Sequence, residues 1–153
     1  MKKGYVYLIF INTILALLQT SLFLELFGNN LNPNLILAFA FAFLVTDKTS
    51  LAFFSALSGG LILDSLSSTT PGLTTFVLVT LMGFSVLMRR LLLKNYASLL
   101  VLVFCSTLLN AVALNITRGG DFEQTIVCAV LTTAFAVIIS LLVKNLVHEN
   151  KYL

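Results

Sequence analysis

The chain has 153 residues, of which 59% are hydrophobic and 10% are charged, and its mean hydropathy is +1.04. This composition excludes a soluble globular domain, in which about 25% of the residues are charged. Six membrane-spanning helices of about 20 residues each would use about 120 positions and leave about 33 for all loops and ends. We therefore expect an integral membrane protein without a separate soluble domain, and we attribute the net charge of +3 to membrane topology and not to nucleic-acid binding.

Charged and helix-breaking residues divide the sequence into six apolar segments, and each predicts one transmembrane helix. The expected fold class is therefore all-α, with one six-helix transmembrane domain over residues 1–153. In chain order the expected spans are about 4–27, 33–46, 49–66, 71–88, 96–116 and 122–146. The second is short, because ~14 residues rise only about 21 Å. Asn32-Pro33 and Thr70-Pro71 each place a capping residue before a proline, which predicts the starts of the second and fourth helices.

The basic residues predict the orientation of these spans. Eight of the nine fall on one side of the predicted membrane, and Arg118 alone falls on the other. The eight are Lys2, Lys3, Lys48, Arg89, Arg90, Lys94, Lys144 and Lys151. Because cytoplasmic loops carry an excess of lysine and arginine, both termini are expected in the cytoplasm.

Asp64 is the most informative polar residue, because it lies near the exterior end of the predicted third helix. A carboxylate there meets the unfavourable end of the helix dipole, so some other group should compensate it. Counting back in fours gives Gly60, Ala56 and Ala52, a stripe of small residues that would let another helix approach closely. Two interpretations stay open. The stripe is internal packing with Asp64 solvated or capping a loop, or it is a partner-binding surface that ends at Asp64.

The remaining polar residues within the spans have simpler interpretations. Asn12 and Gln19 are seven residues apart on the first span, and Asn110 lies in the fifth; each is expected to make interhelical hydrogen bonds. Glu25 is expected to reach water. The basic cluster Arg89, Arg90 and Lys94 is expected to set topology and to contact anionic lipid headgroups.

The sequence offers little for catalysis. Its only histidine, His148, lies in the predicted cytoplasmic tail, and the spans contain no pair of carboxylates or nucleophile with a base. Cys105 and Cys128 both fall in apolar runs, which favours neither a disulfide nor a metal site. We therefore expect no enzyme activity, no catalytic or metal-binding residue and no cofactor.

Several short motifs resemble those of the MreD family of rod shape-determining proteins. They are Leu18-Gln19-Thr20-Ser21-Leu22-Phe23 at the end of the first span, Asn32-Pro33-Asn34-Leu35 at the start of the second, Ser58-Gly59-Gly60-Leu61-Ile62-Leu63-Asp64, and Pro71-Gly72-Leu73 before a helix with Gly83. The third motif resembles the family's glycine-rich helix that ends in Gly-Leu-x-x-Asp. The chain departs from the family at Asn34, where many members carry an acidic residue.

The resemblance implies a multi-pass protein of the bacterial inner membrane that acts in cell elongation. Its partners would be MreC, through the transmembrane helix and the start of the periplasmic region, other elongation-complex proteins and membrane lipids. MreC in turn links the MreB cytoskeleton to lateral peptidoglycan synthesis. On this basis Ala52, Ala56, Gly60 and Asp64 are the expected partner-binding residues.

The MreD family is also similar in fold to the substrate-binding subunits of energy-coupling factor transporters, so a vitamin-binding subunit is the alternative. Such a pocket needs several convergent polar or aromatic groups. The predicted exterior loops are short, contain no tryptophan and carry few charges. The sequence therefore favours a scaffold that binds a protein partner.

Overall fold

The computed structural model describes residues 2–22, 25, 33–66, 72–92, 101, 103–109, 112 and 122–149. Every regular element in this described part is helical, which confirms the all-α class. The α-helices are Lys2–Leu17 (α1), Leu35–Val45 (α3), Thr49–Leu66 (α4), Leu73–Leu92 (α5) and Phe122–Glu149 (α7). A π-helical segment, Leu18–Leu22, continues α1, and residues 103–109 are also helical.

Within the described residues, three helices are long and apolar enough to cross a membrane. They are Gly4–Leu22, Thr49–Leu66 and Thr125–Val143. Leu35–Val45 and Leu73–Arg89 are shorter apolar helices. Much of the predicted fifth span, 96–116, lies outside the described residues, so the six-span topology stays a prediction.

The start of α3 differs from the predicted one. Pro33 precedes the helix, and Asn34 is its N-cap, with Oδ1 accepting a hydrogen bond from the Leu37 N–H at 3.0 Å. The Leu35 N–H donates to Oε1 of Gln19 at 3.1 Å. The prediction from Asn32-Pro33 was wrong because side chains from the cap and from another helix satisfy the first free N–H groups of α3.

The start of α5 also lies later than predicted. The helix begins at Leu73, and Thr70 and Pro71 lie outside the described residues. Gly72 precedes it with a φ of +87°, a conformation that glycine adopts without strain, and its carbonyl accepts a hydrogen bond from Phe76 N–H. The chain therefore turns at Gly72 before the helix starts.

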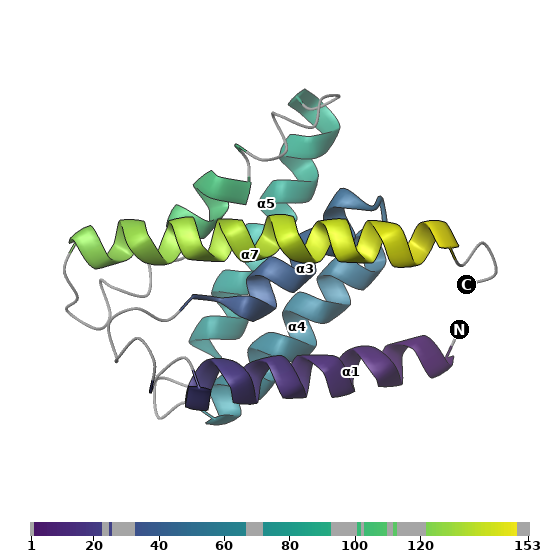
Figure 1. Ribbon diagram of the computed structural model, residues 1–153. Helices are drawn as coiled ribbons and strands as arrows, with labels where there is room; N and C mark the ends of the chain where they lie inside the picture. The colour runs from purple at the N-terminus through teal and green to yellow at the C-terminus, as the bar shows by residue number, and fades with distance from the viewer. Residues whose placement is uncertain are drawn as a thin grey trace.

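Helix α3 lies at the centre of the described helices (Figure 1). It packs against α7 and α4, while α1 and α5 both pack against α4. The start of α1 and the end of α7 lie at the same end of the molecule in Figure 1. Antiparallel α1 and α7 thus flank the central pair.

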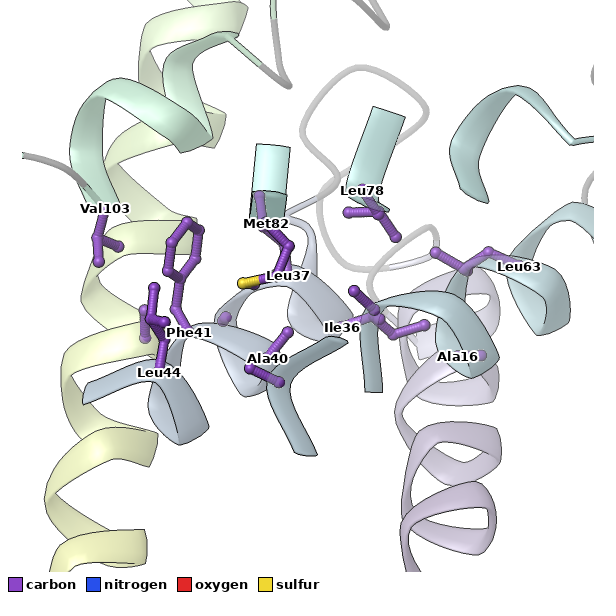
Figure 2. Packing of buried hydrophobic residues seen from close by; sticks show 14 residues of the cluster. Ala16, Ile36, Leu37, Ala40, Phe41, Leu44, Leu63, Leu78, Met82 and Val103 are labelled. Carbon is purple, nitrogen blue, oxygen red and sulfur yellow. The ribbon is translucent and has the colours of Figure 1, made fainter. Parts of the chain in front are cut away.

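The hydrophobic core is built around α3. Every residue from Leu35 to Ala42 is buried, which is the burial expected for a helix that is apolar on all sides. Figure 2 shows side chains of α1, α4, α5 and the 103–109 segment gathered around it. They are Ala16, Leu63, Leu78, Met82 and Val103, packed beside Ile36, Leu37, Ala40, Phe41 and Leu44 of α3.

Two adjacent glycines let α4 approach both of its central neighbours. A Cβ atom at Gly59 would overlap the side chain of Ile36 on α3. A Cβ atom at Gly60 would lie 2.7 Å from the Cα atom of Thr75 on α5. The backbone of α4 therefore touches α3 and α5 at positions where any side chain would push the helices apart.

Candidate functional site

The carboxylate of Asp64 caps the start of α5. Oδ1 accepts a hydrogen bond from Thr74 N–H at 3.1 Å, and Oδ2 accepts from Thr75 N–H at 3.0 Å and Thr75 Oγ1 at 2.6 Å. The positive end of the α5 dipole also faces this carboxylate. The compensation predicted for Asp64 thus comes from α5 within the same chain.

The side chain that caps α5 comes from another helix, because the residue directly before α5 is a glycine. Serine, threonine, aspartate and asparagine usually accept hydrogen bonds from the first turn of their own helix. Gly72 occupies the corresponding place here and has no side chain to do so. Asp64, ten residues before Thr74, replaces it and joins the end of α4 to the start of α5.

The stripe of small residues faces the interior. Ala52 and Ala56 have no exposed surface, and both belong to the core cluster. Gly60 lies against Thr75, and Asp64 is 9% exposed. The contacts of these residues are therefore within the chain, and a partner helix would reach them only if α5 moved away. Their role in partner binding stays a prediction.

Asn12 joins α1 to α4 by a fully paired amide. Its Nδ2 donates to the Ser55 carbonyl at 3.1 Å and to Ser58 Oγ at 2.8 Å, and its Oδ1 accepts from Ser55 Oγ at 3.1 Å. Near the N-terminal ends of both helices, the rings of Tyr5 and Phe54 meet edge to face at 4.7 Å. The interhelical hydrogen bonds predicted for Asn12 are confirmed.

A second polar group surrounds the start of α3. Gln19 accepts from Leu35 N–H, and the backbone N–H of Asn34 donates to Oγ1 of Thr132 on α7 at 3.1 Å. The interhelical bond predicted for Gln19 is thus confirmed, but Gln19 contacts α3 whereas Asn12 contacts α4. Gln19 lies within the π-helical segment Leu18–Leu22, whereas Asn12 lies in the regular α-helix before it. Asn110 lies outside the described residues.

The ends of α3 and α5 meet through Arg89. Its guanidinium donates to the Leu44 carbonyl in the last turn of α3 and to Oδ1 of Asp47 at 2.6 Å. Asp47 has a positive φ of 64° in the turn between α3 and α4, and its side chain is 86% exposed. Arg89 therefore neutralises the negative end of the α3 dipole as well as pairing with a carboxylate.

The structure describes fewer contacts for the other charged residues that were considered in the sequence. Arg90 lies in the last turn of α5, and Lys94 lies outside the described residues. Glu25 is exposed, as expected. Lipid contact by Arg89, Arg90 and Lys94 stays a prediction, and the described contacts of Arg89 are with Leu44 and Asp47.

Three structurally important residues were missed by the reasoning from sequence. Thr75 binds Asp64, Asp47 pairs with Arg89, and Asn34 caps α3. A signal was present only for Asn34, an asparagine directly before a long apolar run. The contacts of Thr75 and Asp47 depend on how helices pack, which residue spacing alone does not encode.

Comparisons with protein-family models, with curated proteins and with solved structures found no match for this chain.

Proposed function

We propose that this protein is a non-catalytic scaffold of the bacterial inner membrane, with six transmembrane helices and both termini in the cytoplasm. Its proposed partner is MreC, the single-span protein of the cell-elongation complex. The motif resemblance at the ends of the first and third spans suggests this family. The arrangement of the described helices is compatible with it.

The contacts between helix ends support the alternating topology. At one end of the bundle, the π-helical segment after α1 meets the start of α3, and the end of α4 meets the start of α5. At the other end, Arg89 on α5 meets the end of α3. Each of these helices therefore runs antiparallel to the next in the chain. With the end bearing Arg89 and Lys48 in the cytoplasm, this direction agrees with the distribution of basic residues.

The observation that carries the proposal is the apolar outer surface of the flanking helices. Val6, Phe10 and Ile14 on α1 are 42% to 66% exposed, and Ile138 and Leu142 on α7 are 54% and 58% exposed. Such apolar surfaces pack against lipid or against the transmembrane helix of a partner. The polar side chains of Asn12, Gln19 and Asp64, by contrast, bind groups inside the bundle.

Helix α5 offers a third outward surface. Phe76, Phe84 and Leu87 recur at helical spacing and are 45% to 70% exposed. Since Asp64, Gly60 and Arg89 fix the other contacts of α5, a partner helix lying here would bind a firmly held element. We therefore include α5 among the surfaces to be tested for contact with MreC.

Topology is tested first by cysteine labelling in a background in which Cys105 and Cys128 are replaced by serine. Asp47→Cys and Ser65→Cys place thiols at two exposed positions at opposite ends of α4. A membrane-impermeant maleimide should label Ser65→Cys in intact spheroplasts, and Asp47→Cys only after permeabilisation. The reverse pattern would overturn the proposed orientation.

Partner binding is tested by photo-crosslinking in cells that co-express MreC. A benzophenone amino acid replaces Phe10 on α1, Phe76 on α5 or Ile138 on α7, one at a time. We expect a covalent adduct with MreC from one helix and little from the other two, because a single partner helix covers one face. Absence of an adduct at all three, together with no co-purification at equal expression, would refute the scaffold proposal.

The same purification addresses the transporter alternative. A vitamin-binding subunit would co-purify with an ATPase and a coupling subunit and would retain a small molecule through gentle extraction. Recovery of those subunits instead of MreC would favour a vitamin-binding subunit over a scaffold.

A further inference from the structure

One buried polar atom in the described structure has no partner. The side chain of Asn34 is buried, with the residue 4% exposed, and its Oδ1 accepts a hydrogen bond from Leu37 N–H. This bond sets the orientation of the amide, so Nδ2 points away from the helix backbone. Nδ2 makes no hydrogen bond. A buried donor in this condition is unusual, since buried polar groups are nearly always paired.

The depth of Asn34 makes the missing partner more significant. Helix α3 has 11 residues and is about 16 Å long, roughly half of a 30 Å hydrocarbon core. Its C-terminal end lies beside the charged side chains of Arg89 and Asp47, at one face of the membrane. Its start therefore lies inside the hydrocarbon core, about 16 Å from that face.

Contacts with α1 and α7 place the start of α3 between the midplane and the opposite face, since Leu35 N–H donates to Gln19, three residues before the end of the candidate span Gly4–Leu22. Asn34 N–H donates to Thr132, which lies two residues from position 134, the midpoint of the candidate span Thr125–Val143. Pro33 and Asn34 are not helical. Non-helical backbone at this depth occurs only where it is enclosed by protein or lines a polar cavity. The start of α3 is therefore enclosed by protein, with one side-chain donor left unpaired.

The surrounding groups define what kind of ligand would fit. The described polar side chains that bond at this point, Gln19, Asn34 and Thr132, are all neutral. Gln19 and Thr132 already accept hydrogen bonds from the backbone of Leu35 and Asn34, and Nδ2 of Asn34 is a buried donor without a partner. An anion without a cationic partner is costly at this depth, so a neutral acceptor oxygen fits better.

We propose that the start of α3 binds a ligand through a neutral carbonyl oxygen, of an ester or an amide, that accepts a hydrogen bond from Nδ2 of Asn34. A membrane glycerolipid would supply an ester carbonyl, and a small neutral molecule would supply an amide. This site is distinct from the surfaces proposed for MreC binding, and the proposal does not depend on whether MreC binds.

The test uses the full-length protein with ¹⁵N-labelled asparagine in lipid nanodiscs. Nanodiscs of diether phosphatidylcholine contain no ester carbonyl, whereas diester nanodiscs of matched chain length do. In the diether discs, N-methylacetamide is then titrated as the amide probe. The Nδ2 resonances of Asn34 are followed by NMR, and those of Asn12 serve as the matched control, because the Asn12 amide is buried and fully paired.

The backbone N–H signal of Asn34 is assigned without a variant, and its side-chain signals are assigned by their loss from two variants. Pro33-Asn34 is the one Pro-Asn pair in the sequence, so ¹³C-proline with ¹⁵N-asparagine labelling identifies its backbone N–H. Asn34→Ser, which keeps an acceptor for Leu37 N–H, and Asn34→Asp provide a second assignment through loss of the side-chain signals. Both variants should also abolish any ligand-dependent shift nearby.

We expect the Asn34 side-chain resonances to move downfield in one arm while those of Asn12 stay in place. A change between diether and diester discs identifies a lipid ester as the ligand, and a saturable change with N-methylacetamide identifies a small amide. Resonances of Asn34 that are the same in all conditions, or that move together with those of Asn12, would overturn the proposal.

Discussion

Asp64 and Thr75 are joined twice, since Oδ2 of the carboxylate accepts from both the backbone N–H and the hydroxyl group of Thr75, at 3.0 and 2.6 Å. Asp64 lies in the last turn of α4, and Thr75 lies in the first turn of α5. The same pair of helices meets at Gly60, four residues earlier, where a Cβ atom would lie 2.7 Å from the Cα atom of Thr75. Asp64 and Gly60 therefore act on one helix junction, the first through charge and the second through close approach.

Replacing Asp64 should loosen this junction. Asp64→Asn keeps the shape of the side chain but turns one acceptor into a donor, so at least one N–H in the first turn of α5 loses its partner. We expect a loss of about 1–3 kcal/mol, because hydrogen bonds to charged groups contribute about that much. Thermal unfolding in detergent would show it as a lower midpoint. Ser65→Ala, at the exposed neighbouring residue, should change stability by less than about 0.5 kcal/mol.

Gly60 tests the close approach of the same helices. Gly60→Ala adds a Cβ atom against backbone, which cannot rotate aside, so we expect overpacking to cost about 1–3 kcal/mol. Gly83→Ala is the matched control, because its nearest neighbour is Phe53 at 3.9 Å. Alanine there should be neutral or stabilise α5 by up to about 1 kcal/mol. Equal melting temperatures for the two variants would contradict the packing at Thr75.

Gly60→Leu separates packing from partner binding. We expect it to lower both the melting temperature and the recovery of MreC, since the larger side chain displaces α5. If MreC recovery falls while the melting temperature is unchanged, the small-residue stripe contacts the partner directly. Unchanged recovery at equal expression would show that partner binding does not depend on this face.

Arg89 and Asp47 should contribute unequally to the free energy of unfolding. The ion pair is largely exposed on the Asp47 side, so it is worth about 0.2–1 kcal/mol and weakens with salt. Asp47→Asn keeps an acceptor and tolerates the positive φ, so its effect should be small. Arg89→Ala also removes the bond to the Leu44 carbonyl and should cost more. Unfolding midpoints at low and high salt would distinguish the two contributions, and equal losses for both variants would contradict this ranking.

Asn12 should couple α1 to α4. Its hydrogen bonds to Ser55 and Ser58 lie inside the bundle, where such bonds contribute about 0.6 kcal/mol on average and about 1.7 at most. A double-mutant cycle of Asn12→Ala and Ser55→Ala isolates the bond between the two side chains. Additive losses of stability would mean that this pair does not hold the helices together.

Much of the helical plan follows from hydropathy alone. The segment 49–66 was predicted with the same bounds that α4 has, because charged or polar residues limit the apolar run on both sides. The starts of α3 and α5 were predicted two residues too early. There the prolines suggested local capping, whereas Gln19 and Asp64 from other helices accept from N–H groups of α3 and α5, together with the local cap Asn34 in α3.

The sequence by itself determined that this protein is helical and apolar enough to enter a membrane, since both properties depend on composition and local periodicity. It also singled out Asp64 as a carboxylate that needs compensation. Only the tertiary structure decided what compensates it, because Thr74 and Thr75 reach the carboxylate only when the start of α5 packs beside the end of α4. The same packing turned Ala52, Ala56 and Gly60 inward and left Nδ2 of Asn34 without a partner, since burial and pairing are properties of neighbouring helices rather than of one segment.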